Sequence, residues 1–132
     1  MINLNEAVGI YPARGRHYDD KKGVEVSIAI QKKNGSPNSI VFAFYGEKPF
    51  RIFAEHGVVP YIYKDKIVFV IDDENGYTFS TRGTISKAKI KKGEIKIIND
   101  QLLLFCINNE GGYKLKYDYD SKFYYINMRE RL

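Results

Sequence analysis

The chain has 132 residues, a length at which one domain buries roughly two thirds of the surface that its unfolded form exposes. It is 44% hydrophobic and 28% charged, which excludes wholesale disorder. No apolar run approaches the roughly 20 residues of a membrane-spanning helix. Residues 1–6 carry neither the basic stretch nor the long apolar stretch of a secretory signal, so we expect a cytoplasmic protein.

The N-terminal residues 1–23 show no hydrophobic period and contain Tyr11-Pro12 and Arg14-Gly15-Arg16. Such a stretch is typical of a loop rather than of a helix or strand. We interpret residues 1–23 as an N-terminal arm or loop packed on the domain or on a partner. Residues 24–132 then form a single β domain.

Short apolar runs separated every eight to twelve residues by turn residues are typical of consecutive antiparallel strands. The predicted strands are 24–32, 39–46, 58–63, 66–72, 76–81, 84–91, 94–98, 101–107, 112–118 and 122–127. We expect Asn34-Gly35 and Asn75-Gly76 to supply the positive φ angles of tight hairpins. Lys91-Lys92-Gly93 and Glu110-Gly111-Gly112 are expected to turn the chain in the same way. The predicted fold is an all-β antiparallel barrel or sandwich of about ten short strands joined by hairpins, with at most one short helix.

The one candidate helix lies at 47–56. Pro49 suits the first turn of a helix, and Gly57 suits a C-terminal cap. A short strand at 50–53 is the competing interpretation, and the pattern does not decide between them.

Two segments of the chain resemble each other. Residues 65–79 align with residues 100–115 once a single residue is inserted, and in both an apolar run is followed by an acidic or amide turn and Gly-Tyr. Either a hairpin has been duplicated, or two hairpins share the same turn requirements. Both interpretations predict two equivalent hairpins in one sheet system.

Three predicted strands are apolar on both faces: 40–45, 67–71 and 102–107. A two-layer sandwich covers one face of each strand, so the other faces need the helix, barrel closure or a second copy of the chain. Six exposed apolar side chains would forfeit on the order of 10 kcal/mol, which is comparable to the stability of a domain. The pattern therefore favours a homo-oligomer or a subunit of a larger assembly.

The inventory for catalysis is thin. No motif links His17 or His56 to a nucleophile, and no phosphate-binding or dinucleotide-binding loop occurs. Cys106 lies inside an apolar run and is expected to be a buried hydrophobic residue. The Asp118-x-Asp120 pair resembles the opening of a calcium loop, but Lys122 stands where a third oxygen ligand belongs. We therefore expect no enzyme activity, no metal and no cofactor.

Basic residues gather in the middle of the chain. Lysines at every second position place Lys87, Lys89 and Lys91 on one face of the predicted strand 84–91, and such a face can follow a phosphate backbone. The net charge of +5 favours polyanions only where it is concentrated in this way. The candidate polyanion-binding residues are Arg14, Arg16, Arg82, Lys87, Lys89, Lys91, Lys92 and Lys96. A solvated, aggregation-blocking strand face is the alternative for the lysines.

Tyrosines could add stacking on bases. The candidates are Tyr61, Tyr63, Tyr117 and Tyr119, with Tyr124 and Tyr125 nearby in the sequence. Because tyrosine is also a favoured strand residue, packing is the alternative for each.

The sequence thus predicts a non-enzymatic binding protein that captures nucleic acid or another polyanion by charge, with little sequence readout. A structural or inhibitory protein–protein interaction subunit, as in viruses or mobile elements, is the alternative. A small hydrolase with an unrecognised site is the third.

Overall fold

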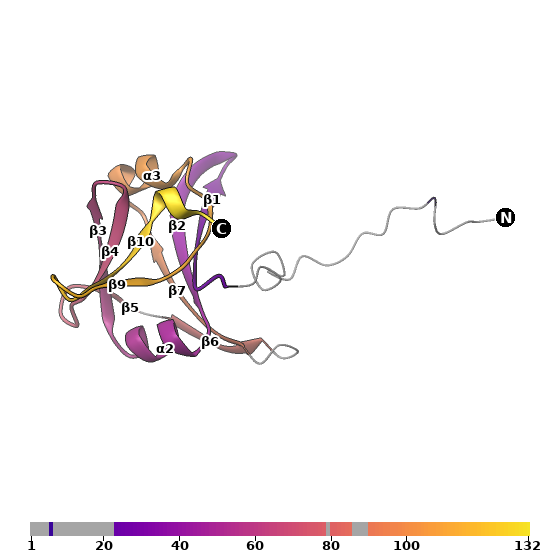
Figure 1. Ribbon diagram of the computed structural model, residues 1–132. Helices are drawn as coiled ribbons and strands as arrows, with labels where there is room; N and C mark the ends of the chain where they lie inside the picture. Colours follow the sequence, from indigo (N-terminus) through magenta and orange to yellow (C-terminus); the bar gives the residue numbers. More distant parts are fainter. Residues whose placement is uncertain (1–5, 7–22, 79, 86–89) are drawn as a thin grey trace.

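The structure is a computed structural model that describes residue 6 and residues 23–78, 80–85 and 90–132. For residues 80–85 and 90–92 it describes the backbone only. Across the described residues two antiparallel sheets pack face to face as a sandwich that does not close into a barrel (Figure 1). The predicted all-β antiparallel fold is therefore confirmed, and the choice between barrel and sandwich falls to the sandwich. Two short helices are present where at most one was expected.

In the described ranges each sheet has five strands, and neighbouring strands pair in antiparallel fashion. Sheet A has the order β6 (Ser80–Ile85), β7 (Ile90–Ile97), β2 (Ser36–Tyr45), β1 (Val26–Lys33) and β8 (Gly111–Tyr113). Sheet B has the order β5 (Tyr77–Thr78), β3 (Gly57–Tyr63), β4 (Lys66–Ile71), β10 (Phe123–Asn127) and β9 (Lys116–Asp118). The remaining elements are α2 (Glu47–Phe53), α3 (Asp100–Cys106) and the 3-10 turn η2 (Met128–Glu130).

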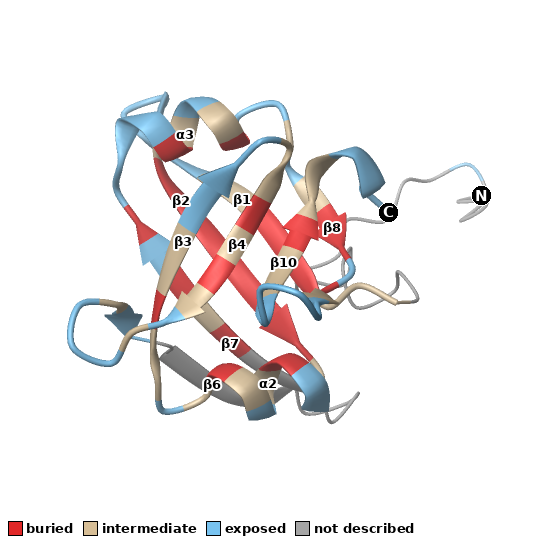
Figure 2. Ribbon diagram, turned by 60° about the vertical axis from the view of Figure 1, so that its left-hand side comes forward, coloured by how far each residue is buried: buried red, intermediate tan, exposed pale blue. Residues whose placement is uncertain are grey.

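The core fills the space between the two sheets. Directly paired residues share a face of a sheet, so the register identifies the inward side chains. Sheet A contributes Val26, Ile28, Ile40, Phe42, Phe44, Ile95 and Ile97, and sheet B contributes Val58, Ile67, Phe69 and Ile126. Figure 2 shows these buried segments gathered on the strands and on the helix sides, with exposed segments at the turns. The strand alternation in the sequence is thus realised as one shared apolar layer.

Helix α2 follows β2 and packs against β2 and β7 near one open end of the sandwich (Figure 1). It buries Pro49 in its first turn and Phe53 in its last, so the helical interpretation of this segment is correct. The predicted cap at Gly57 is wrong, because Ala54 caps the helix and Glu55 takes the left-handed conformation at φ 67°. Gly57 instead opens β3, where an added Cβ would lie 2.4 Å from the carbonyl oxygen of Asp72.

Helix α3 corrects the strand predicted at 101–107. The side chain of Asn99 accepts a hydrogen bond from the backbone N–H of Leu102 at 2.9 Å and so caps the helix. The run Leu-Leu-Leu-Phe-Cys contains no β-branched residue, whereas the matching run of β4, Ile-Val-Phe-Val-Ile, has four. Branching at Cβ favours strands and disfavours helices. The two similar segments therefore fold differently, and the prediction of two equivalent hairpins is wrong.

Three predicted strands have different boundaries in the structure. Segments 76–81 and 112–118 each divide into two strands that belong to different sheets. The expected strand 84–91 is also divided, since β6 ends at Ile85 and β7 begins at Ile90. The segment Lys91 to Gly93, expected as a turn, lies inside β7. The sequence pattern marks strands well but does not mark where the chain crosses between layers.

Among the predicted glycine turns, Asn34-Gly35 is confirmed, since both residues have positive φ angles of 54° and 82°. Asn75-Gly76 is wrong in this respect, because neither residue has a positive φ. The glycine is needed there for space: a Cβ on Gly76 would lie 2.4 Å from the backbone nitrogen of Val58. Gly57 and Gly76 thus let the β4–β5 turn pack closely on the start of β3.

Strand β2 is covered on both faces by the chain itself. Ile40, Phe42 and Phe44 face sheet B, and Val41 and Tyr45 on the opposite face are no more than 8% exposed. Strand 40–45 therefore needs no second copy, because the chain itself supplies the cover that the sequence calls for on both faces. The segment 102–107 needs no such cover, because a helix has replaced the strand. Of the three segments, 67–71 in β4 keeps apolar residues on an outer face without a covering layer among the described residues. Self-association stays a prediction.

A side-chain link joins the start of β3 to the β4–β5 turn. The backbone N–H of Gly57 donates to Oδ1 of Asp73 at 3.0 Å, and Nδ1 of His56 lies 3.0 Å from the same oxygen. The pKa of Asp73 is lowered below its ordinary value mainly by the hydrogen bond from Gly57 and next by the hydrogen bond with His56.

This link predicts a pH effect. A carboxylate whose pKa is lower in the folded state stabilises the fold above its unfolded pKa, and that contribution is lost as pH falls through the folded pKa. We expect Asp73→Asn to flatten the fall in the free energy of unfolding below about pH 4, measured by urea denaturation at several pH values. Glu74→Gln is the matched control, because its carboxylate makes no hydrogen bond or ion pair among the described residues. If the free energy of unfolding of Asp73→Asn falls below about pH 4 as steeply as that of the wild type, the prediction is contradicted.

Candidate functional site

The outer face of sheet B carries a hollow of about 720 Å³. Its walls come from β3, β4, β10 and the β9–β10 turn, and they are mainly aromatic and apolar. The lining residues are Tyr61, Tyr63, Lys64, Lys66, Val68, Val70, Asp118, Ser121, Phe123 and Tyr125. We call this hollow the tyrosine groove. Its volume lies in the range of binding sites for small ligands or for a few residues of a polymer.

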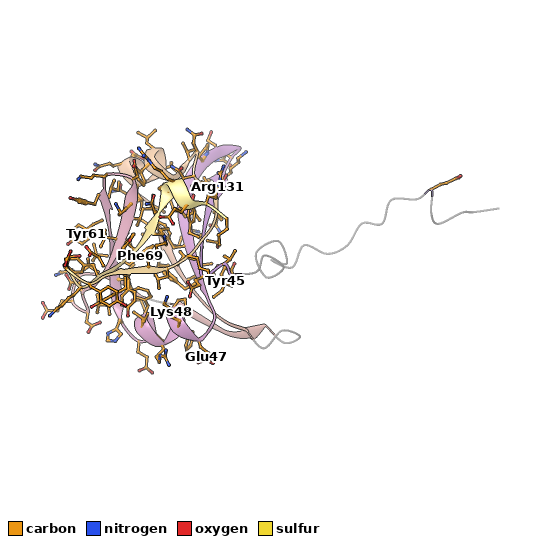
Figure 3. All side chains as sticks on the ribbon, in the orientation of Figure 1. Tyr45, Glu47, Lys48, Tyr61, Phe69 and Arg131 are labelled. Atoms are coloured by element: carbon orange, nitrogen blue, oxygen red, sulfur yellow. The ribbon has the colours of Figure 1, made fainter. Side chains whose placement is uncertain are left out.

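The register of sheet B places the aromatic rings of the tyrosine groove side by side. Tyr61 pairs with Val68, and Val68 pairs with Tyr125 on its other side, so these three side chains form one row across three strands. Tyr63 pairs with Lys66 in the next row. Tyr61 is 53% exposed and Figure 3 shows it at the outer side of sheet B, while Phe69 lies between the sheets at 2% exposure. The rings are therefore available to a ligand.

Two lysines lie over tyrosine rings of the groove. Nζ of Lys64 is 5.2 Å from the ring centroid of Tyr63, and Nζ of Lys66 is 5.8 Å from that of Tyr125. Both distances are within the range of cation–π contacts. Among the described residues neither ammonium group lies within ion-pair distance of a carboxylate.

Two other described basic residues beside sheet B, Lys116 and Arg129, are paired with carboxylates. Lys116 contacts Glu130, and this hydrogen bond is the main cause that raises the pKa of Lys116. Nε of Arg129 lies 2.7 Å from Oδ2 of Asp65. Among the residues that line the groove, the basic ones are Lys64 and Lys66.

The C-terminal residues hold the β3–β4 turn that carries these lysines. The backbone N–H of Met128 donates to the carbonyl oxygen of Asp65 at 2.8 Å, next to the Arg129 ion pair. The last residue, Leu132, donates to the carbonyl oxygen of Gly112 in sheet A at 2.8 Å. The C-terminal residues thus link the β3–β4 turn to sheet A, and these hydrogen bonds hold the turn beside the groove in place.

Asp118 lines the tyrosine groove where the chain turns at 118–121. Its Oδ2 accepts from the hydroxyl of Ser121 at 2.7 Å, and its Oδ1 accepts from the backbone N–H of Asp120 at 3.2 Å. The Ser121 bond is the main cause that lowers the pKa of Asp118, and the charge of Lys66 contributes. The side chain is therefore a charged acceptor at neutral pH.

The structure does not bring the predicted basic residues to this site. Arg14, Arg16, Lys87 and Lys89 lie outside the described residues, and Arg82, Lys91 and Lys92 are placed by backbone only, in β6 and β7. Lys96 is exposed on the outer face of sheet A, where it pairs with Val41. The outer faces of the two sheets point in opposite directions. The polyanion-binding role of these residues stays a prediction.

The four candidate tyrosines separate into two pairs. Tyr61 and Tyr63 line the groove, whereas Tyr117 packs its ring on Tyr119 and Tyr124 at centroid distances of 5.0 and 4.7 Å. Tyr119 is 83% exposed in the β9–β10 turn and does not line the groove.

Sequence reasoning did not single out Lys64, Lys66 or Phe123. A signal for the lysines was present, since Tyr61, Tyr63, Lys66 and Val68 share one face of a hairpin by simple alternation about its two-residue turn.

The described residues hold no other evident chemical centre. No three His, Cys, Asp or Glu side chains in these ranges stand close enough to hold a metal ion. Cys106 is buried as predicted, and burial raises the pKa of its thiol to about 12. Each helix of the described chain has seven residues, too few to cross a membrane.

Comparisons with known protein families, with curated proteins and with solved structures give no match to this chain. The class that the structure defines is a β-sandwich with an aromatic groove on one outer face.

Proposed function

We propose that the protein is a non-enzymatic binding protein that holds single-stranded nucleic acid in the tyrosine groove. The observation that carries this proposal is the placement of Lys64 and Lys66 over the rings of Tyr63 and Tyr125, with neither ammonium group within ion-pair distance of a carboxylate among the described residues. Proteins that bind single strands combine stacking rings with cations that follow the backbone. The groove provides both within one row of strands.

In the proposed mechanism the tyrosine rings bind the bases of the ligand and the lysines bind its phosphates. Unpaired bases stack on the exposed ring of Tyr61 and on the half-buried ring of Tyr125, and Val68 between them forms an apolar floor. The lysine ammonium groups contact phosphates at the edge of the hollow. A duplex is excluded from this mode, because its bases are stacked on one another and present no free face.

Binding to a fluorescent single-stranded oligonucleotide, measured by anisotropy at several salt concentrations, tests the proposal. Two phosphate contacts on a single strand correspond to a slope of log K against log salt of about −1.4 from these residues. We expect the double variant Lys64→Gln, Lys66→Gln to weaken binding and to make the slope shallower by about that amount.

Lys96→Gln is the matched control, because Lys96 is an exposed strand lysine on the outer face of the other sheet. Its slope should equal that of the wild type. The groove is not the binding surface if Lys96→Gln alone changes the slope, or if duplex of equal length binds as well as the single strand.

Protein binding is a second candidate, which a different surface favours. Helix α3 and its preceding residues expose aliphatic side chains, with Leu104 at 74% and Ile98 at 69% exposure. Exposed aliphatic residues grouped in this way are typical of contacts with a protein or with a second copy of the chain. Sizing over a range of concentrations tests self-association, which requires the apparent mass to rise with concentration and Leu104→Lys to abolish the rise.

A further inference from the structure

The acidic residue of the tyrosine groove is the feature that the proposed function leaves unused. Asp118 is the one carboxylate among the described residues that line the hollow, and its cross-strand partner is Phe123. Tyr125 lies two positions further along the same strand and therefore on the same face. A carboxylate repels phosphate, so its position among rings that hold bases calls for a different contact.

The turn orients this carboxylate and leaves it able to accept further hydrogen bonds. Each oxygen of an ionised carboxylate can accept about two hydrogen bonds. In Asp118, Oδ1 accepts from the backbone N–H of Asp120 and Oδ2 from the hydroxyl of Ser121, and the backbone N–H of Ser121 also favours the charged carboxylate. The carboxylate lines the hollow and keeps acceptor capacity beyond these contacts. The position of the carboxylate is set before a ligand arrives.

We propose that Asp118 selects the base held in the groove and favours guanine. This inference rests on the proposed function. The Watson–Crick edge of guanine presents the N1–H and N2–H donors side by side, which matches the two oxygens of a carboxylate. Adenine and cytosine offer one amino group to the carboxylate. In thymine and uracil one N–H lies between two carbonyl groups. The carboxylate repels the carbonyl oxygens, so these bases fit it poorly. The expectation of little sequence readout thereby changes to a preference for one base.

Lys66 contributes to the selection without reading the base. Its charge makes the smallest of the contributions that lower the pKa of Asp118, after the hydrogen bonds of the turn. It also lies over the ring of Tyr125, where it faces the ligand backbone. The groove then distinguishes the two parts of a nucleotide, with cations for the phosphate and an anion for the base edge.

The test compares three oligodeoxynucleotides of thymine that differ at three central positions, which carry guanine, hypoxanthine or thymine. Hypoxanthine keeps N1–H but lacks the amino group at C2. We expect wild-type protein to bind the guanine strand about tenfold or more tightly than the thymine strand, with the hypoxanthine strand between them.

Asp118→Asn should remove this preference and retain binding. The amide oxygen can still accept from the backbone N–H of Asp120 and keep the turn, but a side chain with one acceptor no longer matches two donors. Asp120→Asn is the control for a merely structural or charge effect in the turn, since it removes a carboxylate that does not line the groove and keeps the backbone N–H that donates to Asp118. Its preference for guanine should persist.

The outcomes separate the inference from the proposed function. Equal affinity of the wild type for all three strands overturns base selection by Asp118 and leaves single-strand binding standing. A preference for guanine that survives in Asp118→Asn also overturns it. Failure to bind any of the strands overturns the proposed function and this inference together, and leaves a protein as the occupant of the groove to be tested.

Discussion

Replacing Tyr61 or Tyr125 with alanine is expected to reduce the affinity for a single-stranded oligonucleotide about 5- to 150-fold each. The estimate corresponds to the roughly 1–3 kcal/mol by which a stacked base is stabilised on an aromatic side chain. The two rings belong to strands on either side of β4 and are separated by two strand spacings, about 10 Å. Effects at that separation are close to additive, so the double variant should show their sum in free energy.

Tyr119→Ala is the matched control for the ring substitutions. Tyr119 is 83% exposed and lies outside the groove, so its variant should bind like the wild type. Circular dichroism and the thermal midpoint show whether each variant is folded. Affinities in Tyr61→Ala and Tyr125→Ala that match the control would remove stacking from the mechanism.

Phe69→Ala is expected to lower the free energy of unfolding by about 3–5 kcal/mol. Phe69 lies in the centre of the sandwich, with its ring centroid 5.4 Å from that of Phe42, 5.3 Å from Phe44 and 6.1 Å from Phe53. Removing it leaves a cavity among rings from β2 and α2 and removes three edge-to-face contacts.

Urea denaturation with a fixed m-value measures this loss. Phe123→Ala is the control, since Phe123 is in the same sheet but 42% exposed on its outer face. Its stability should change by less than about 1 kcal/mol. In the binding assay we expect Phe123→Ala to lower the affinity and Phe69→Ala, as far as it stays folded, to keep it, because Phe123 lines the groove and Phe69 does not. A small effect of Phe69→Ala would show that the contacts between the sheets are not the main source of stability.

Several elements were predictable from local sequence, for physical reasons that the structure makes plain. The strands predicted at 24–32 and 66–72, which are β1 and β4, and the Asn34-Gly35 turn depend only on neighbouring residues, and these predictions are correct. Helix α3 was missed although its signals were local. Asn99 stands as a cap before a run without β-branched residues, but an apolar run of that length suits a buried strand equally well.

The candidate site was predictable only in part. Tyr61 and Tyr63 were singled out as aromatic residues that could stack on bases, and both line the groove. Tyr117 and Tyr119 were grouped with them by type, but one packs on other rings and the other projects from a turn. The contribution of β10 depends on its pairing with β4, more than fifty residues away in the chain. Register between distant strands is set by how the whole apolar layer fits together, which a single sequence does not display.

By itself, the sequence determined that this chain folds into antiparallel strands around an apolar layer, because alternation and turn residues act over a few positions. Only the tertiary structure decided which strands share a sheet, that β2 is covered from both sides, and that tyrosines and lysines of β3, β4 and β10 meet on one outer face. The physical reason is range. Backbone preferences are local, whereas coverage and convergence depend on which distant surfaces exclude water together.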